Sequence, residues 1–272
     1  MSLLSPDRYR VVLAPDRVLF MHRKGLLRDR IESTKTWATD ANDAASPPWR
    51  SALDALGRNL PKTTSGKPRV SVVLSNHFCH YALLKRRDEL TGHAELLAYA
   101  RHRMKAAFGE AVGNWDLKLT DAGEGSGYLA SAVDGALLEA IRALCRDRNL
   151  HLASIQPYLA VAFNRCRKAL EKRTVWFVVQ EEGRLVVSLF RTGTWASVAS
   201  RRVGPRWTTE LQNILDREKQ LVEVEGVECN EVLLYAPGLG HASDFKGSRY
   251  RVELVRLDST RTSGDRSYAM AA

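Results

Sequence analysis

The chain has 272 residues, of which 44% are hydrophobic and 26% are charged. This balance is typical of a soluble globular protein and excludes an intrinsically disordered one. The 41 Lys and Arg residues outnumber the 31 Asp and Glu residues and give a formal charge of +10. Such a charge favours an acidic partner, a nucleic acid or an anionic membrane face, without choosing among them.

No stretch of the sequence approaches the roughly 20 consecutive apolar residues of a membrane span. The opening MSLLSPDRYR lacks the basic start and the apolar core of a signal peptide. The cysteines are widely spaced and form no CxxC pair. We therefore expect a cytoplasmic protein with reduced thiols.

The first β-rich runs are YRVVLAP and RVLFMHRKG, and Pro15-Asp16 between them predicts a hairpin. The alternating run DRIESTKTWA then completes a meander. In SPPWRSALDALGRNL, Ser46 is expected to cap a helix whose first turn contains Pro47 and Pro48. These elements predict a small antiparallel sheet followed by a helix.

The next run, RVSVVLSNHFCHYALLKRRDEL, places His77, Cys79 and His80 within four positions. We expect one strand here, so period-2 alternation puts His77 and Cys79 on one face and His80 on the other. Metal ligands must converge, and no further ligands stand out in the sequence. We interpret the run as the central strand of the first half, not as a site.

The middle of the chain predicts helices and strands in alternation. GHAELLAYARHRMKAAFG is a helix that ends at Gly109, and WDLKLTDAGEGSGYLASAV is two strands around a glycine-rich turn. DGALLEAIRALCRDRN predicts another helix, and LHLASIQPYLAVAFNRCRKAL predicts a short strand that continues into a helix.

At Thr174 the pattern starts again with three short strands, a helix, the buried strand EVLLYAP and the final strand RYRVELVRL. The strands turn at Glu182-Gly183 and Thr192-Gly193. The sequence thus predicts a duplicated α/β fold with halves at 1–173 and 174–257, the second one reduced. The polar residues 258–272 are expected to form a flexible tail.

Two successive β-meander-plus-helix halves resemble the actin-like, ribonuclease-H-like architecture. The segments VSVVLSNHFCHYALL, ELLAYARHRMKAAFG and IQPYLAVAFNRCR resemble actin-like assembly proteins of type IV pili and type II secretion. These are the PilM-like and MSHA-biogenesis-like proteins and the cytoplasmic part of GspL. The resemblance covers about residues 8 to 257. It implies a cytoplasmic protein, peripheral to the bacterial inner membrane, that binds a short cytoplasmic segment of an inner-membrane assembly protein.

The resemblance also implies where a nucleotide would bind. An actin-like ATPase holds phosphates between two hairpin loops, each with an Asp for metal-bound water and a Gly that admits the phosphate to the backbone. In LAPDRVLF, Asp16 is present, but no Gly follows and Pro15 lacks an N–H group. In QEEGRLVV, Gly183 fits, but Glu181 and Glu182 stand where an Asp is expected.

The adenosine loop of such a protein is a Gly-Gly pair, whereas LLYAPGLGHASDF has Gly238 and Gly240 separated. We therefore expect Asp16, Gly183, Gly238 and Gly240 to mark degenerate nucleotide loops. The expected protein is a pseudo-ATPase that needs no cofactor. The simpler interpretation of Asp16 and Gly183, as ordinary hairpin residues, carries the larger weight.

Other candidate sites are weaker. TTSGKPRV lacks the first Gly and the final Ser or Thr of a phosphate-binding loop. The basic runs at 85–87 and 165–173 are expected to be solvated faces, and a docking surface for an acidic partner or anionic lipid is the sharper alternative. A nuclease would need converging carboxylates, and Asp16, Asp116, Asp121 and Asp134 fall at turns or strand ends.

The sequence leaves three functions open. The first is a non-enzymatic scaffold of a type IV filament or type II secretion platform. The second is an ATP-binding actin-like protein in which the nucleotide, with Mg²⁺, changes partner affinity. The third is a nucleic-acid-binding or nuclease protein of ribonuclease-H-like fold, which is disfavoured because neither stacking aromatics nor a recognition helix is evident.

Overall fold

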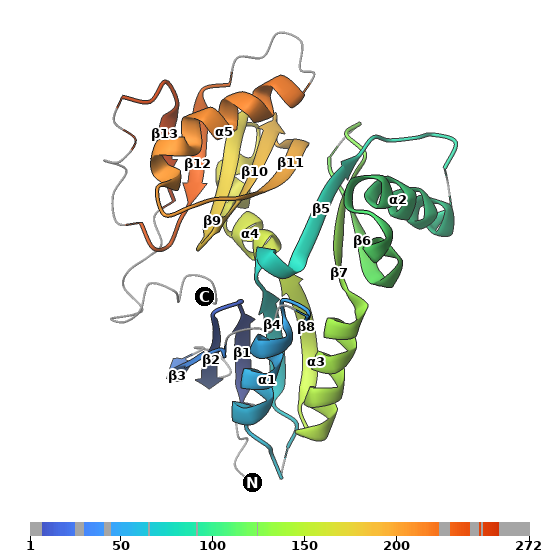
Figure 1. Ribbon diagram of the computed structural model, residues 1–272, viewed down its shortest axis with the longest axis vertical. Coiled ribbons are helices and arrows are strands. Elements are labelled where there is room, and N and C mark those ends of the chain that lie inside the picture. Colours follow the sequence, from blue (N-terminus) through green and yellow to red (C-terminus); the bar gives the residue numbers. More distant parts are fainter. Residues whose placement is uncertain are drawn as a thin grey trace. The chain divides into compact units, whose positions relative to one another are not determined.

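The computed structural model describes residues 7–24, 30–40, 45–64, 66–90, 92–123, 125–222, 229–239, 245 and 247–255. Within these ranges the chain forms 13 strands in three sheets and five α-helices (Figure 1). The described residues fall into two compact units, one with 7–79 and 133–161 and the other with 80–132 and 162–255. These units differ from the two halves predicted from the sequence, each of which contains one five-stranded sheet. The division into halves stays a prediction. Residues 258–272 lie outside the described ranges.

The first unit contains a five-stranded sheet in the order β3-β2-β1-β4-β8. The first three strands are antiparallel, whereas β1 pairs with β4, and β4 with β8, in parallel. This confirms the predicted meander. The strands are β1 (Arg8–Leu13), β2 (Arg17–Lys24), β3 (Arg30–Ala38), β4 (Arg69–Leu74) and β8 (His151–Pro157).

Helices α1 (Arg50–Asn59) and α3 (Gly135–Asp147) complete this unit. The Asp134 carboxylate caps α3 by accepting from Ala136 N at 2.9 Å, and it also accepts from Trp49 Nε1 at 2.8 Å. One side chain thus fixes the starts of both helices. The prediction that Ser46 caps α1 is wrong. The N-cap residue is Trp49, and Arg50 N donates to Pro47 O in the turn that precedes the helix.

The second unit contains two sheets. The smaller has the order β5-β7-β6 and lies beside α2 (Figure 1). A cluster of buried side chains packs the helix against the sheet. Gly109, at φ 78°, ends α2 as the sequence predicted. The elements are β5 (Cys79–Leu84), α2 (His93–Phe108), β6 (Trp115–Asp121) and β7 (Tyr128–Asp134).

The larger sheet of this unit has the order β11-β10-β9-β12-β13, and its antiparallel and parallel pairings follow the same sequence as those of the first sheet. The duplication predicted from the sequence is therefore confirmed in the strand topology. Its strands are β9 (Val175–Glu181), β10 (Arg184–Arg191), β11 (Thr194–Arg202), β12 (Glu231–Tyr235) and β13 (Arg251–Leu254).

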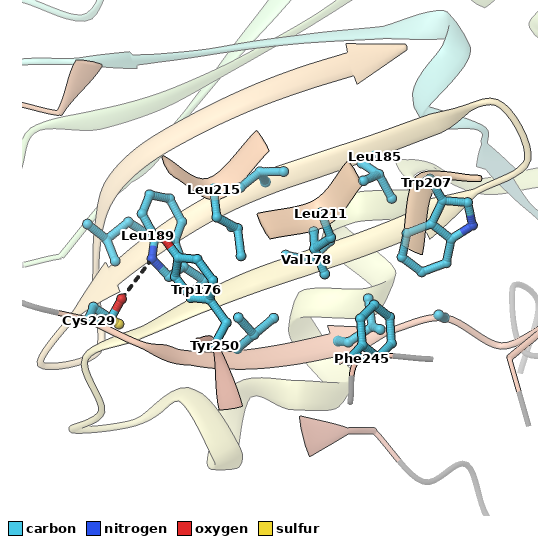
Figure 2. Close-up of a cluster of buried hydrophobic side chains, with 14 residues drawn as sticks. Trp176, Val178, Leu185, Leu189, Trp207, Leu211, Leu215, Cys229, Phe245 and Tyr250 are labelled. Carbon is cyan, nitrogen blue, oxygen red and sulfur yellow. Dashed lines mark hydrogen bonds between the residues drawn. The ribbon is translucent and has the colours of Figure 1, made fainter. Parts of the chain in front are cut away.

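Helices cover both faces of this larger sheet. On one face, α5 (Trp207–Leu221) buries Leu211 and Leu215 in the cluster of Figure 2, where Trp176 Nε1 donates to Cys229 O at 3.3 Å. On the other face, Phe163 of α4 (Tyr158–Leu170) stacks on Phe190 with ring centroids 5.7 Å apart. Each fully buried large apolar side chain contributes about 1.5–3 kcal/mol.

The glycine-rich turn between β6 and β7 supplies a test of the smaller sheet. Gly127 has φ +97°, and a Cβ there would lie 2.1 Å from Leu84 O of the neighbouring strand. Gly125 has φ +73° and open space around it. We expect Gly127→Ala to lower the free energy of unfolding by about 3 kcal/mol or more, and Gly125→Ala by about 1 kcal/mol. Urea unfolding of both variants measures the difference, and equal losses would contradict the close approach at Gly127.

Candidate functional site

The first candidate loop lies at the carboxyl edge of the first sheet. Because β1 and β4 are parallel, their carboxyl ends meet, and Ser75 N donates to Leu13 O at 2.9 Å. Ala14 N donates to Arg17 O at 3.0 Å and closes the turn at Pro15-Asp16. The predicted hairpin is therefore present, with Asp16 at its tip. We call the residues 14–16 and 75–76 the first edge.

Several polar groups of this turn are engaged within the protein. Thr39 donates its hydroxyl to Pro15 O at 2.7 Å and its N–H to Asp16 O at 3.1 Å. Arg17 Nε lies 2.7 Å from the Asp16 carboxylate, which is about half exposed. Pro15 has no N–H group, and that of Ala14 closes the turn. A phosphate cradle needs several convergent N–H donors, so this turn is poorly suited to hold one.

Two buried polar residues at the same edge escaped the sequence analysis. Ser75 and Asn76 are both 0% exposed. Ser75 Oγ accepts from His77 N at 3.1 Å, and Asn76 Oδ1 accepts from Leu159 N at 3.1 Å in the first turn of α4. The pair thus ties the end of β4 to the start of α4. The available signal was a Ser-Asn pair directly after an apolar, β-branched run.

The histidine-containing run is two strands, so the prediction of a single strand is wrong. β4 ends at Leu74, a 3₁₀ turn spans Asn76–Phe78, and β5 starts at Cys79. The cause is the Ser75 hydroxyl, which caps the turn. Of the three candidate ligands, His77 therefore lies in the turn, whereas Cys79 and His80 belong to β5. Among the residues that the structure describes, no three His, Cys, Asp or Glu side chains are grouped to hold a metal ion.

His80 instead belongs to an aromatic cluster. Its ring stacks on Trp115 with centroids 4.0 Å apart and planes 8° apart, and Phe108 meets it edge-on at 5.1 Å. Burial, and secondly the positive charge of Arg184, lower the pKa of His80 to about 4. The imidazole is thus neutral at physiological pH and packs as an aromatic ring.

The second candidate loops lie at the carboxyl edge of the larger sheet in the other unit. β9 and β12 are parallel, and Val179 pairs with Tyr235, so the turn at 182–183 and residues 236–238 follow at one edge. We call these residues the second edge. Gly183 has φ 73°, the left-handed conformation that this turn requires, and its carbonyl accepts from Val203 N at 3.1 Å.

Gly238 lies in a turn closed by Leu239 N and Ala236 O at 3.0 Å, with open space where a Cβ would be. The structure therefore brings the loops of Gly183 and Gly238 to the same edge. Glu181, which ends β9 directly before this turn, is buried with 3% exposure. Gly240 lies outside the described residues.

The remaining predicted groups have structural explanations. Asp134 caps a helix, and Asp121 accepts from Gly123 N at 2.7 Å within its turn. Arg173 bridges Glu231 and Glu253, at 3.1 Å each, and so ties β12 to β13. Lys85, Arg86 and Arg87 are exposed, as expected of a solvated run.

The four cysteines are free and buried, as expected of reduced thiols. Burial raises the pKa of Cys145 to about 11 and that of Cys166 to about 12. Both are therefore protonated at physiological pH and poorly nucleophilic.

Two five-stranded sheets of the same topology, each with turns at its carboxyl edge, are the architecture of the actin-like fold. Similar solved structures confirm this fold. A Bacteroides thetaiotaomicron protein of actin-like ATPase fold and unknown function matches with TM-score 0.60 and 10% identity, over 92% of this chain and 91% of that one. The cytoplasmic domain of EpsL, an inner-membrane component of the Vibrio cholerae type II secretion system, matches with TM-score 0.55 and 12% identity, over 92% and 90%.

A chain of the PilM-PilN type IV pilus biogenesis complex matches with TM-score 0.61 and 11% identity, over 97% of this chain and 90% of that chain. At such identities the likeness shows the fold alone. No protein-family model and no curated protein sequence matches. In the part of the chain that the structure describes, no helix is long and apolar enough to cross a bilayer.

The partly buried, neutral state of His80 predicts a pH dependence of stability. The folded pKa of about 4 lies below the ordinary value of 6.5, so the unfolded chain takes up a proton first as the pH falls. The free energy of unfolding should therefore decrease from pH 6.5 to pH 4 through this group. Urea unfolding should show a shallower pH dependence in His80→Phe than in the wild type, with exposed His102→Phe as the control. Equal slopes in wild type and His80→Phe would contradict a lowered pKa of His80 in the folded protein.

Proposed function

We propose that the protein is a non-enzymatic cytoplasmic scaffold of a type IV filament or type II secretion platform at the bacterial inner membrane. It binds the cytoplasmic segment of a membrane-anchored assembly protein. The similarity in fold to the EpsL cytoplasmic domain and to a chain of the PilM-PilN complex supports this class of function. Both matches extend over nine-tenths or more of this chain, so they concern the whole architecture.

The single observation that favours a scaffold over an ATPase is the turn at the first edge. Its two carbonyls accept from Thr39, its carboxylate pairs with Arg17, and Pro15 lacks a donor. Hydrolysis of ATP requires stabilisation of charge that develops on the phosphates, and N–H donors and a bound metal ion supply it. The first edge offers little of either, so the protein acts through what it binds.

A second function has one observation in its favour. Gly183 and Gly238 lie at the same edge of one sheet, and Gly238 leaves open space beside the backbone. An actin-like protein that binds ATP with Mg²⁺ without hydrolysing it would use such glycines. The nucleotide would then change partner affinity by favouring one conformation.

The partner assay separates the two functions. The intact chain is titrated with the cytoplasmic N-terminal segment of the membrane-anchored platform protein from its own genome, with and without ATP and Mg²⁺. The scaffold should bind the segment with an affinity that changes by less than about twofold on addition of nucleotide, since equal affinity for both states shifts nothing. A segment of the same composition in scrambled order is the matched control.

Two results would contradict the proposal. Tenfold or greater dependence of the affinity on nucleotide would favour the ATP-binding function instead. Normal piliation and type II secretion in a strain that lacks this gene would remove the protein from both systems.

A further inference from the structure

The strand register of the first sheet aligns basic residues on one face. In the β1–β2 pair Arg8 lies directly opposite Arg23, and in the β1–β4 pair it lies directly opposite Arg69. Directly paired residues point to the same face of a sheet. Neighbouring strands are about 4.8 Å apart, so three arginines lie in a row about 10 Å long. His151 of β8, which pairs with Arg69, extends that row.

Further positive charge gathers at the same end of the unit, where β1, β4 and β8 start and β2 ends. Lys24 is the last residue of β2, and Lys67 lies two residues before β4 begins at Arg69. Arg146 lies in the last turn of α3, which leads back to β8 (Figure 1). We call Arg8, Arg23, Lys24, Lys67, Arg69 and Arg146 the basic pole.

Most of the positive charge of the basic pole is exposed, whereas Arg23 interacts with another group of the protein. Arg8, Lys24, Lys67, Arg69 and Arg146 are exposed, and within the described ranges no carboxylate pairs with Arg8 or Arg69. The carboxylate of Asp7, which precedes Arg8 in the chain, lies 3.0 Å from His22 Nε2. His22 pairs with Tyr9 and therefore lies on the opposite face of the sheet from Arg23. Like charges directly opposite each other in a sheet are destabilising. An anionic surface that covers the pole would remove this repulsion.

The composition of the pole discriminates among anionic partners. The next residues on this face are Arg10, Ser71 and Ser154, so the imidazole of His151 is the one aromatic ring among these described residues, and no series of rings is available to stack on successive bases. The charges come from strand ends, a loop and a helix end. They are therefore spread over one end of the unit and do not follow a line that would match a single strand of nucleic acid. Arginine guanidinium groups bind phosphate through paired N–H donors.

We propose that the basic pole binds the anionic phospholipid surface of a membrane. The proposal deepens the proposed function, because it gives a scaffold at the inner membrane a lipid contact of its own. Each cationic side chain near an anionic bilayer contributes about fivefold to the partition coefficient, and the attraction weakens as salt rises.

Vesicle co-sedimentation of the intact chain tests the proposal. The probes are vesicles of phosphatidylcholine alone and of an equal mixture with phosphatidylglycerol. The wild type should bind only the mixed vesicles and should be released by high salt. The double variant Arg8→Glu/Arg69→Glu should lose more than about 25-fold in partition coefficient. The control Arg103→Glu/Arg217→Glu, which alters exposed arginines of α2 and α5 in the other unit, should lose less than about threefold.

Both double variants lower the formal charge from +10 by the same amount, so a difference between them reports the position of the charges. Circular dichroism and urea unfolding check that both fold. Three results would overturn the proposal: no binding of the wild type to the mixed vesicles, equal losses in the two variants, or binding of the pole to RNA in place of vesicles. The vesicle assay contains no protein partner, so its failure leaves the scaffold function intact, and failure of the partner assay leaves the lipid contact intact.

Discussion

In each five-stranded sheet, the strand that comes first in the chain pairs in parallel with the strand that comes fourth. The structure depends on this pairing. It joins β1 to β4 and β9 to β12 and so brings the carboxyl ends of two strands together at one edge. The turn at Pro15-Asp16 thereby lies beside Ser75 and Asn76, and the turn at Gly183 lies at the edge that carries Gly238. Open α/β sheets bind ligands in this position, so the edges are where nucleotide chemistry would have to occur.

The same pairing gives the two ends of the first sheet different chemistry. At the carboxyl end, hydroxyl, amide and carboxylate groups are used within the fold: Thr39 holds the turn, and Asn76 holds the start of α4. At the opposite end, the register places Arg8 between Arg23 and Arg69. The two ends of this sheet thus differ: polar groups at the carboxyl end are hydrogen-bonded within the fold, and basic residues gather at the opposite end.

Much of the fold could be predicted from the sequence because its signals are local. The hairpin at Pro15-Asp16, the stop at Gly109 and the restart of the pattern at Thr174 each depend on a few neighbouring residues. The break at Ser75-Asn76 was missed because an apolar run on either side fits one long strand equally well. The start of α1 was missed because it depends on Trp49 and Asp134, which are 85 positions apart.

The candidate site was harder to predict than the fold. Sequence alone located Asp16, Gly183 and Gly238, but it could not show that Thr39 and Arg17 engage the first turn. The row of arginines was invisible for a related reason, since Arg8, Arg23 and Arg69 become neighbours only once the strand register is known. Pairing between distant strands is non-local information, and periodicity within each strand does not supply it.

Calorimetry of the intact chain with ATP and Mg²⁺ tests most directly the central claim that we propose, that the two edges do not bind a nucleotide. The matched pair is Gly238→Val at the second edge and Gly113→Val between α2 and β6, because a Cβ meets open space at both positions. We expect no heat beyond dilution for the wild type and for both variants. A saturable binding heat that Gly238→Val abolishes and Gly113→Val retains would contradict this claim.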